Sequence, residues 1–174
     1  MKKILLFIFL LMFGMPALAA NNPLMQQKFW MKATAKDVEV AIKNGSNPLE
    51  VDSYMSTPLH FACMFSKSVE AVKIIIQNGA DINRADRNGF TPLMLSRDIS
   101  IAEELIKNGA DVNARDGDGN AVLIQFLEDK KWDMAELLVD NGANVSVQSR
   151  SRIKASELAR LFNAPDSLKN KLSN

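Results

Sequence analysis

The run Thr57-Pro58-Leu59-His60-Phe61-Ala62 and the ending Asn78-Gly79-Ala80-Asp81-Ile82-Asn83 recur along this chain of 174 residues. The same pair of signals returns at Thr91-Pro92-Leu93 with Asn108-Gly109-Ala110-Asp111, and in weaker form across residues 121–145. A period of about 33 residues is typical of a stacked repeat array.

Each signal has a physical role in starting or ending a helix. The threonine is placed to cap a first helix, and the proline fits its first turn, where a missing backbone donor costs nothing. Glycine just past a second helix adopts the left-handed conformation at little steric cost. The predicted starts are Thr57-Pro58 and Thr91-Pro92, and the predicted stops are Gly79, Gly109 and Gly142. We expect Leu59, Val69, Val72 and Ile76 to face the core of the second repeat, with Ile75 beside them.

These residues resemble the ankyrin repeat, whose consensus joins Asp-x-x-Gly-x-Thr-Pro-Leu-His-x-Ala to a Gly-Ala-Asp-Val-Asn ending. The match is close from Asp52 to Asn113. The resemblance implies an all-α repeat solenoid, with stacked helix-turn-helix repeats and projecting β-turn fingers. It also implies a non-catalytic protein-binding scaffold, without indicating which protein is bound. In the family, the position of His60 forms hydrogen bonds within and between repeats.

The predicted units divide the whole chain. They are a signal peptide at 1–19, a degenerate repeat at 20–51, repeats at 52–85, 86–115 and 116–148, and a capping repeat at 149–174. The third repeat is shortened, because Thr91 to Asn113 spans 23 residues whereas Thr57 to Asn83 spans 27. The missing four residues correspond to about one helical turn, roughly 6 Å. We therefore expect a notch in the stack.

The N-terminus has the pattern of a secretory signal. Lys2 and Lys3 precede an apolar run at residues 4–15 and the small-residue end Ala17-Leu18-Ala19, which predicts cleavage after Ala19. The run is too short to span a bilayer, for which about 20 residues are needed. We expect a monomer exported to the periplasm of a Gram-negative bacterium without membrane insertion. Release outside the cell is the alternative location.

Charge and cysteine content restrict the partners and the chemistry. The chain has 21 Lys and Arg against 20 Asp and Glu, and losing Lys2 and Lys3 leaves one acidic residue in excess. A nucleic-acid partner is not expected, because the sequence shows no basic patch. The single cysteine, Cys63, has no partner for an internal disulfide. Its position favours a small buried side chain, and the alternative is a redox-active thiol.

No residue pattern predicts catalysis, a metal or a cofactor. His60 is the only histidine, so sites that need two are excluded. Asp116-Gly117-Asp118-Gly119-Asn120 begins like a calcium loop, but the sixth position is Ala121 and the twelfth is Leu127 rather than glutamate. The Asp-x-x-Gly turn of the repeat explains the same residues.

The resemblance places a binding surface on the fingers and on a concave face lined by the first helices. Aromatic and methionine side chains exposed there are costly unless a partner covers them, although they could instead fold against adjacent fingers. The expected partner-binding residues are Tyr54, Met64, Phe65, Arg87, Phe90, Asp118, Asn120 and Trp132, and Asp98 is expected on an exposed first helix.

The notch supports a narrower hypothesis. It should expose Phe65 on one side and Trp132 on the other, forming one apolar cleft for a partner's side chain. The alternative is that the shortened repeat closes up by tilting.

Three functions are compatible with these expectations. The first is an exported interaction module that binds another protein, and the second is an inhibitor or immunity protein that neutralises a toxin or enzyme. The third is an envelope stress protein that shields a client enzyme through Cys63.

Overall fold

The computed structural model describes residues 22–173. The predicted signal peptide and its cleavage site lie outside these residues. Within them the chain forms a short 3-10 helix and ten α-helices, and no strand is present. The described part of the chain also contains no helix with the length and apolar character needed to span a membrane.

The helices follow one another in pairs. The 3-10 helix is η2 (Pro23–Met25), and the α-helices are α2 (Gln27–Trp30), α3 (Ala35–Lys43), α4 (Pro58–Phe65), α5 (Val69–Gln77), α6 (Pro92–Leu95), α7 (Ile99–Lys107), α8 (Val122–Glu128), α9 (Trp132–Asp140), α10 (Ala155–Leu161) and α11 (Asp166–Lys171).

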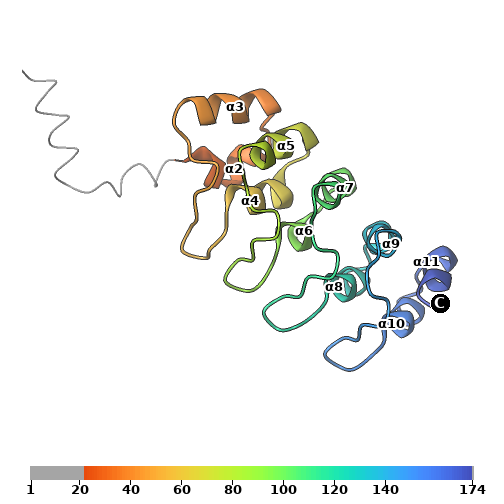
Figure 1. Cartoon of the computed structure of the whole chain (residues 1–174). Coiled ribbons are helices and arrows are strands. Elements are labelled where there is room, and N and C mark those ends of the chain that lie inside the picture. The colour runs from red at the N-terminus through yellow and green to blue at the C-terminus, as the bar shows by residue number, and fades with distance from the viewer. Residues whose placement is uncertain (1–21, 174) are drawn as a thin grey trace, which may run out of the picture.

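The pairs stack into an elongated array of two rows. The inner row contains α2, α4, α6, α8 and α10, and the outer row contains α3, α5, α7, α9 and α11, with each helix contacting its neighbours in its own row. Long turns project from the inner-row side between successive pairs (Figure 1). We call these turns the fingers and define them as residues 52–56, 86–90, 116–120 and 149–153. The all-α repeat solenoid predicted from the sequence is confirmed.

The predicted helix boundaries are present. Thr57 and Thr91 have extended backbone before Pro58 and Pro92, which occupy the first turns of α4 and α6. The Thr91 side chain makes no capping hydrogen bond to α6, so the predicted threonine cap is wrong at that helix. Glycine follows the outer helices in the left-handed region, with φ of 89° at Gly79. Gly109 and Gly142 repeat this conformation, at φ of 94° and 86°. Glycine therefore ends each of these outer helices at the equivalent position of its repeat.

The core face of α5 differs from the sequence prediction by a small rotation. Ala71, Val72 and Ile75 are fully buried, whereas Val69 and Ile76 are only half-buried. The sequence pattern overlooked Ala71 because alanine carries little hydrophobic signal. Its small side chain nevertheless faces the most crowded side of the helix. Leu59 of α4 is fully buried, as expected.

The shortening of the third repeat falls in its inner helix. α6 contains four residues whereas α4 contains eight, and the outer helices α5 and α7 both contain nine. The deletion therefore removes one turn of the inner row and leaves the outer row intact. The C-terminal part of α4 extends past the end of α6 as a result.

Asparagine side chains connect neighbouring repeats, a role that sequence reasoning missed. Asn83 Nδ2 donates to the carbonyl of Gly109 at 3.0 Å, and Asn83 Oδ1 accepts from the backbone N–H of Asp111 at 2.8 Å. Asn113 Oδ1 accepts from the N–H of Asn144 at 2.7 Å in the next repeat. The available signal was the asparagine that ends both the second and the third repeat, Asn83 and Asn113.

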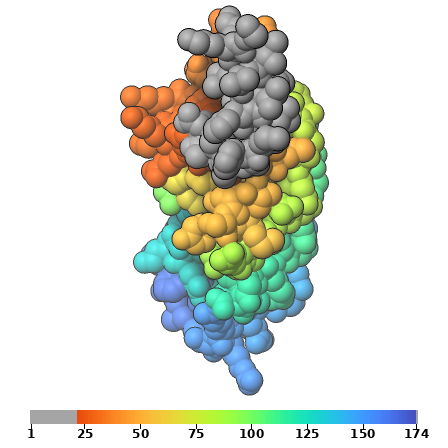
Figure 2. Space-filling model, turned by 90° about the vertical axis from the view of Figure 1, so that its left-hand side faces the viewer, coloured from red at the N-terminus to blue at the C-terminus, as the bar shows by residue number. Residues whose placement is uncertain are grey.

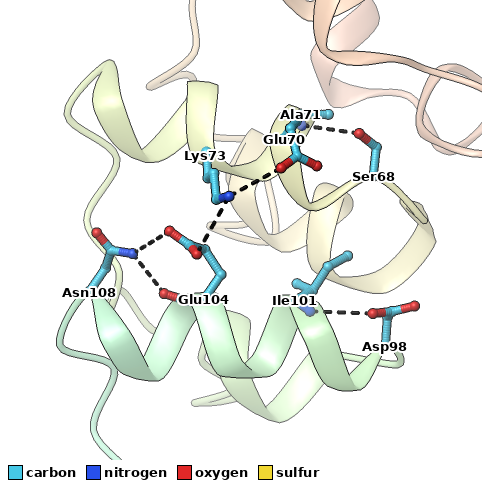
Figure 3. Close-up of polar contacts among 8 residues, drawn as sticks. All are labelled: Ser68, Glu70, Ala71, Lys73, Asp98, Ile101, Glu104 and Asn108. Atoms are coloured by element: carbon cyan, nitrogen blue, oxygen red, sulfur yellow. Dashed lines mark hydrogen bonds and ion pairs between the residues drawn. The ribbon is translucent and has the colours of Figure 1, made fainter.

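Polar contacts on the outer row cap and join its helices (Figure 3). Lys73 of α5 lies 3.1 Å from Glu70 on its own helix and 3.9 Å from Glu104 on α7. The Lys73–Glu70 pair is exposed, and such pairs typically contribute less than about 1 kcal/mol. Asp98, predicted on an exposed inner helix, instead caps α7 by accepting hydrogen bonds from Ser100 and Ile101. The correction follows from the short α6, which ends before Asp98.

Candidate functional site

The first three fingers are turns closed by an aspartate. Asp52 Oδ1 accepts the backbone N–H groups of Tyr54 and Ser56, both at 2.8 Å. Asp86 Oδ1 accepts in the same way from Asn88 and Phe90, at 2.8 and 2.9 Å. Because one carboxylate oxygen closes each of these turns, the role of the aspartate is explained without a metal. In the fourth finger Ser149 takes this position, and its Oγ accepts from the Ile153 N–H. Among the described residues no cluster of His, Cys, Asp or Glu is arranged to hold a metal ion.

Successive fingers are joined through their backbones. Arg87 N–H donates to the carbonyl of Tyr54 at 2.8 Å, and Gly117 N–H donates to the carbonyl of Asn88 at 2.7 Å. A Cβ atom at Gly89 would overlap the backbone of Gly117, so glycine permits this close approach. The fingers form a continuous ridge down one side of the molecule (Figure 2).

His60 connects the second repeat to the next finger. Its Nδ1 accepts from the Thr57 N–H at 3.1 Å and lies 2.8 Å from Thr57 Oγ1, while its Nε2 lies 3.1 Å from the carbonyl oxygen of Phe90. These contacts fit a neutral ring that carries its proton on Nε2. Burial is the main effect on this side chain and lowers the pKa of His60 below its ordinary value. The expected structural role, within and between repeats, is confirmed.

An apolar hollow opens between the first two fingers and the inner row. We call it the aromatic hollow, and its volume is about 290 Å³. Tyr54 of the first finger lines it together with Phe61, Met64 and Phe65 of α4. The rings of Phe61 and Phe65 have centroids 6.3 Å apart. Asp52 and Asp86 lie at its finger side, so the hollow combines apolar walls with two carboxylates.

The structure brings three of the predicted binding residues together in this hollow. Tyr54 is 63% exposed, and Met64 and Phe65 are half-buried. Phe90 was predicted on the exposed ridge, but it is half-buried and packs against the core. This agrees with the alternative that some of these aromatic side chains fold inward and are not free for a partner. The carbonyl of Phe90 also holds His60. Phe90 is therefore structural in this fold.

The other finger residues have different surroundings. Arg87 is exposed, and Asp118 is exposed but forms an ion pair with Arg150 of the last finger. Asn120 turns inward, where its Nδ2 donates to Asp116 Oδ2 at 2.9 Å. Asn120 therefore closes its own turn rather than facing a partner.

The single cleft predicted between Phe65 and Trp132 is not formed. Trp132 lies at the start of α9 in a second hollow of about 460 Å³, which it lines with Arg97, Lys130 and Lys131. Phe65 lies in the aromatic hollow instead. The shortened α6 and the polypeptide that follows it lie between the two, because α6 contacts both α4 and α8.

Cys63 lies in the core and faces no solvent. Its side chain is fully buried on α4, and burial raises the pKa of its thiol well above the ordinary value. Thiolate is the reactive form of cysteine, so this environment suppresses reaction. The structure contradicts the redox hypothesis and confirms the small buried side chain.

Sequence reasoning missed Phe61, Asp52 and Asp86 as lining residues of the aromatic hollow. The available signal for the aspartates was their recurrence at the start of each finger. For Phe61, the signal was an aromatic side chain beside the buried His60, on the helix side that faces the fingers.

Two rows of paired helices with a ridge of fingers define a helical repeat scaffold. A family model described as ankyrin repeats (three copies) matches residues 30–116, which is half of the chain. The chain therefore belongs to the ankyrin-repeat family. Ankyrin repeats generally mediate protein–protein interaction, and the family is typically non-catalytic.

Curated relatives agree with this assignment over short segments. The chain is similar to two ankyrin repeat proteins of fowlpox virus, 42% identical over 57 residues and 34% identical over 53 residues. These segments cover 32% and 30% of this chain, and 13% and 10% of the viral proteins. It is also similar to an ankyrin repeat-containing protein of Schizosaccharomyces pombe, 33% identical over 69 residues, covering 38% of this chain and 33% of the relative.

Proposed function

We propose that this protein is a non-catalytic scaffold that binds another protein through its finger ridge and the adjoining inner row. The observation that carries the proposal is the aromatic hollow, where Tyr54 stays 63% exposed beside Phe61 and Phe65. Exposed aromatic side chains in a preformed hollow are typical anchors for a partner. Tyr54 is on a finger that hydrogen bonds hold in place, and Phe61 and Phe65 are on α4, so little ordering is needed on binding.

We further propose that the scaffold works in the periplasm after export. The support is the sequence of residues 1–19, where two lysines precede an apolar run and an Ala-x-Ala end. The buried Cys63 is compatible with an oxidising compartment, because it is protected from pairing with other thiols. The viral and fungal relatives neither support nor oppose this location.

A capture experiment tests the binding function. The chain from residue 20 onward is used as bait in an envelope extract of the source cell, beside a Tyr54→Ala, Arg87→Ala variant. The matched control is Val40→Ala, which removes an exposed apolar side chain from α3 on the outer row. A partner retained by the parent and the control but lost by the double variant supports the proposal. Equal capture by all three baits would place the contact elsewhere.

Export is tested separately from binding. The full chain is expressed in a Gram-negative host, and the N-terminus of the protein from the periplasmic fraction is determined by mass spectrometry. We expect it to begin at Ala20. Protein that stays in the cytosol and still begins at Met1 would contradict the proposed location and leave the binding proposal intact.

The inhibitor alternative differs from the adaptor in affinity. Inhibitors commonly bind with a Kd near 1 nM, which corresponds to about −12 kcal/mol, whereas adaptor contacts can be micromolar, about −8 kcal/mol. Calorimetry on the captured partner separates the two. Loss of the partner's own activity on binding would assign the inhibitor role.

A further inference from the structure

The aromatic hollow exists because the third repeat lacks one turn of its inner helix. α4 contains eight residues and ends at Phe65, whereas α6 contains four and ends at Leu95. Leu95 reaches the hollow as its far wall, and Met64 and Phe65 in the last turn of α4 line it from the other side. The missing turn leaves a space of about 290 Å³. That volume equals roughly ten water molecules and suits one long side chain.

The charge of the hollow comes from the finger aspartates. The Oδ1 atoms of Asp52 and Asp86 close their turns, but their Oδ2 atoms form no hydrogen bond or ion pair within residues 22–173. No lysine or arginine is among the described residues that line the hollow. His60 lines it as a neutral ring whose two nitrogens are already occupied. The described residues that line the hollow therefore include two negative charges and no positive one, and Arg84 acts on His60 from outside this lining.

We propose that the aromatic hollow binds an arginine or lysine side chain from a segment of the partner protein. This inference rests on the proposed function and specifies the partner chemistry for that surface. The aliphatic stem of the side chain would lie along Met64 and Phe65. The cationic head would face the rings of Tyr54 and Phe61 and the free oxygens of the two aspartates.

Other side chains fit this hollow less well. A carboxylate from the partner would be repelled by Asp52 and Asp86. An aliphatic or aromatic side chain would fill the apolar floor but leave two carboxylates partly desolvated without a partner, which is unfavourable. The charge of the hollow therefore selects a cation and its apolar walls select a long stem.

The test uses five acetylated tripeptide amides, Ala-X-Ala, in which the central residue is Arg, Lys, Gln, Leu or Glu. Each is titrated into the chain from residue 20 onward and followed by NMR. The readout is the ring resonances of Tyr54, which is the only tyrosine in the chain. This choice matters because Tyr54 does not line the second hollow, so a peptide bound beside Arg97, Lys130 and Lys131 would not be counted as binding to the aromatic hollow.

Conservative variants test the two carboxylates. Asp52→Asn and Asp86→Asn keep an oxygen in place for the turn and remove the charge. Asp116→Asn is the matched control, because Asp116 has the same position in the third finger but does not line the hollow. The side-chain amide of Asn120 can rotate to keep its hydrogen bond to residue 116 in this variant. Circular dichroism and thermal unfolding confirm that each variant is folded.

We expect saturable shifts of Tyr54 with the Arg and Lys peptides, at least about tenfold tighter than with the Glu peptide. Binding should weaken at least about fivefold in the Asp52→Asn, Asp86→Asn double variant and in 0.5 M salt, and it should persist in Asp116→Asn. Equal binding of all five peptides, no shift of Tyr54 with Arg or Lys, or unchanged binding in the double variant would overturn the inference. Such a result would leave the capture experiment, and with it the scaffold function, unaffected.

Discussion

Met55 occupies a finger position that glycine takes in the next two fingers. Its φ is +62°, close to the +82° of Gly89 and the +84° of Gly119. A residue with a Cβ atom pays about 1–2 kcal/mol in this left-handed region. Its side chain is 43% exposed and so regains little through packing.

Met55→Gly should therefore stabilise the fold. We expect the free energy of unfolding to rise by about 0.5–1 kcal/mol, because relief of the strained backbone exceeds the entropy that glycine adds to the unfolded chain. Urea denaturation monitored by circular dichroism measures the change. Met55→Ala is the control and should be nearly neutral, since it keeps the strain. A destabilised Met55→Gly would show that the methionine side chain contributes packing.

His60 makes the fold sensitive to mildly acidic pH. Burial lowers its pKa in the folded protein below the value in the unfolded chain, which is near 6.5. Above pH 6.5 His60 is neutral in both the folded and the unfolded state, so its protonation does not lower the free energy of unfolding. As the pH falls below 6.5, the unfolded chain binds a proton that the folded protein resists, so stability declines until the folded pKa is reached.

Unfolding by urea at pH 7.5, 6.5 and 5.5 tests this prediction. The free energy of unfolding should fall by up to about 1.4 kcal/mol per pH unit below 6.5. His60 is the only histidine, so His60→Gln should be less stable at pH 7.5 but lack this slope. A slope that persists in the variant would assign the effect to carboxylates instead.

At the scale of the helix pair, Leu49 takes the place of the asparagine that joins later repeats. Asn83 is held by Gly109 and Asp111 of the next repeat, and Leu49 lies beside the corresponding Gly79 and Asp81. Leu49 is 48% exposed and cannot form either hydrogen bond.

Leu49→Asn should create both bonds and stabilise the first two repeats by about 1 kcal/mol. The reciprocal variant, Asn83→Leu, should destabilise by about 1–3 kcal/mol because it leaves a backbone carbonyl and an N–H without partners. Thermal unfolding of both variants checks the pair. An unchanged or lower stability for Leu49→Asn would indicate that the first repeat is held at a different spacing.

At the scale of the whole molecule, the main helix contacts within residues 22–173 join neighbouring repeats. α11 packs mainly on α10 and α9, whereas α7 contacts α5, α6 and α9. Leu168 of α11 and Leu105 of α7 are both fully buried. Stability in such an array is close to a sum over repeats and interfaces, so local damage need not spread.

The two leucines should therefore differ when each is replaced by alanine. Leu168→Ala should raise hydrogen exchange mainly in α10 and α11, while Leu105→Ala should raise it across the stack and cost about 2–5 kcal/mol in global stability. Hydrogen exchange with mass spectrometry resolves the two cases. A uniform rise in both variants would show that the array unfolds as a single cooperative unit.

The repeat architecture was predictable from the residues because its signals are local. Thr57-Pro58 starts a helix and Gly79 ends one through the conformations that their own backbones allow, and the shortened third repeat follows from a count of residues. The core face of α5 was predicted only in part, because Ala71 is buried more deeply than Val69 or Ile76.

The binding surface depended on contacts between repeats, which no local pattern contains. Whether an aromatic side chain is free or covered depends on its position in the finger and on what the neighbouring repeat places against it. Phe90, four residues after Asp86, is half-buried beside His60, whereas Tyr54, two residues after Asp52, remains exposed. The sequence alone therefore established the family, the helices and the missing turn. Only packing of α4 against the shorter α6 separated Phe65 from Trp132 and placed two aspartates over an apolar hollow.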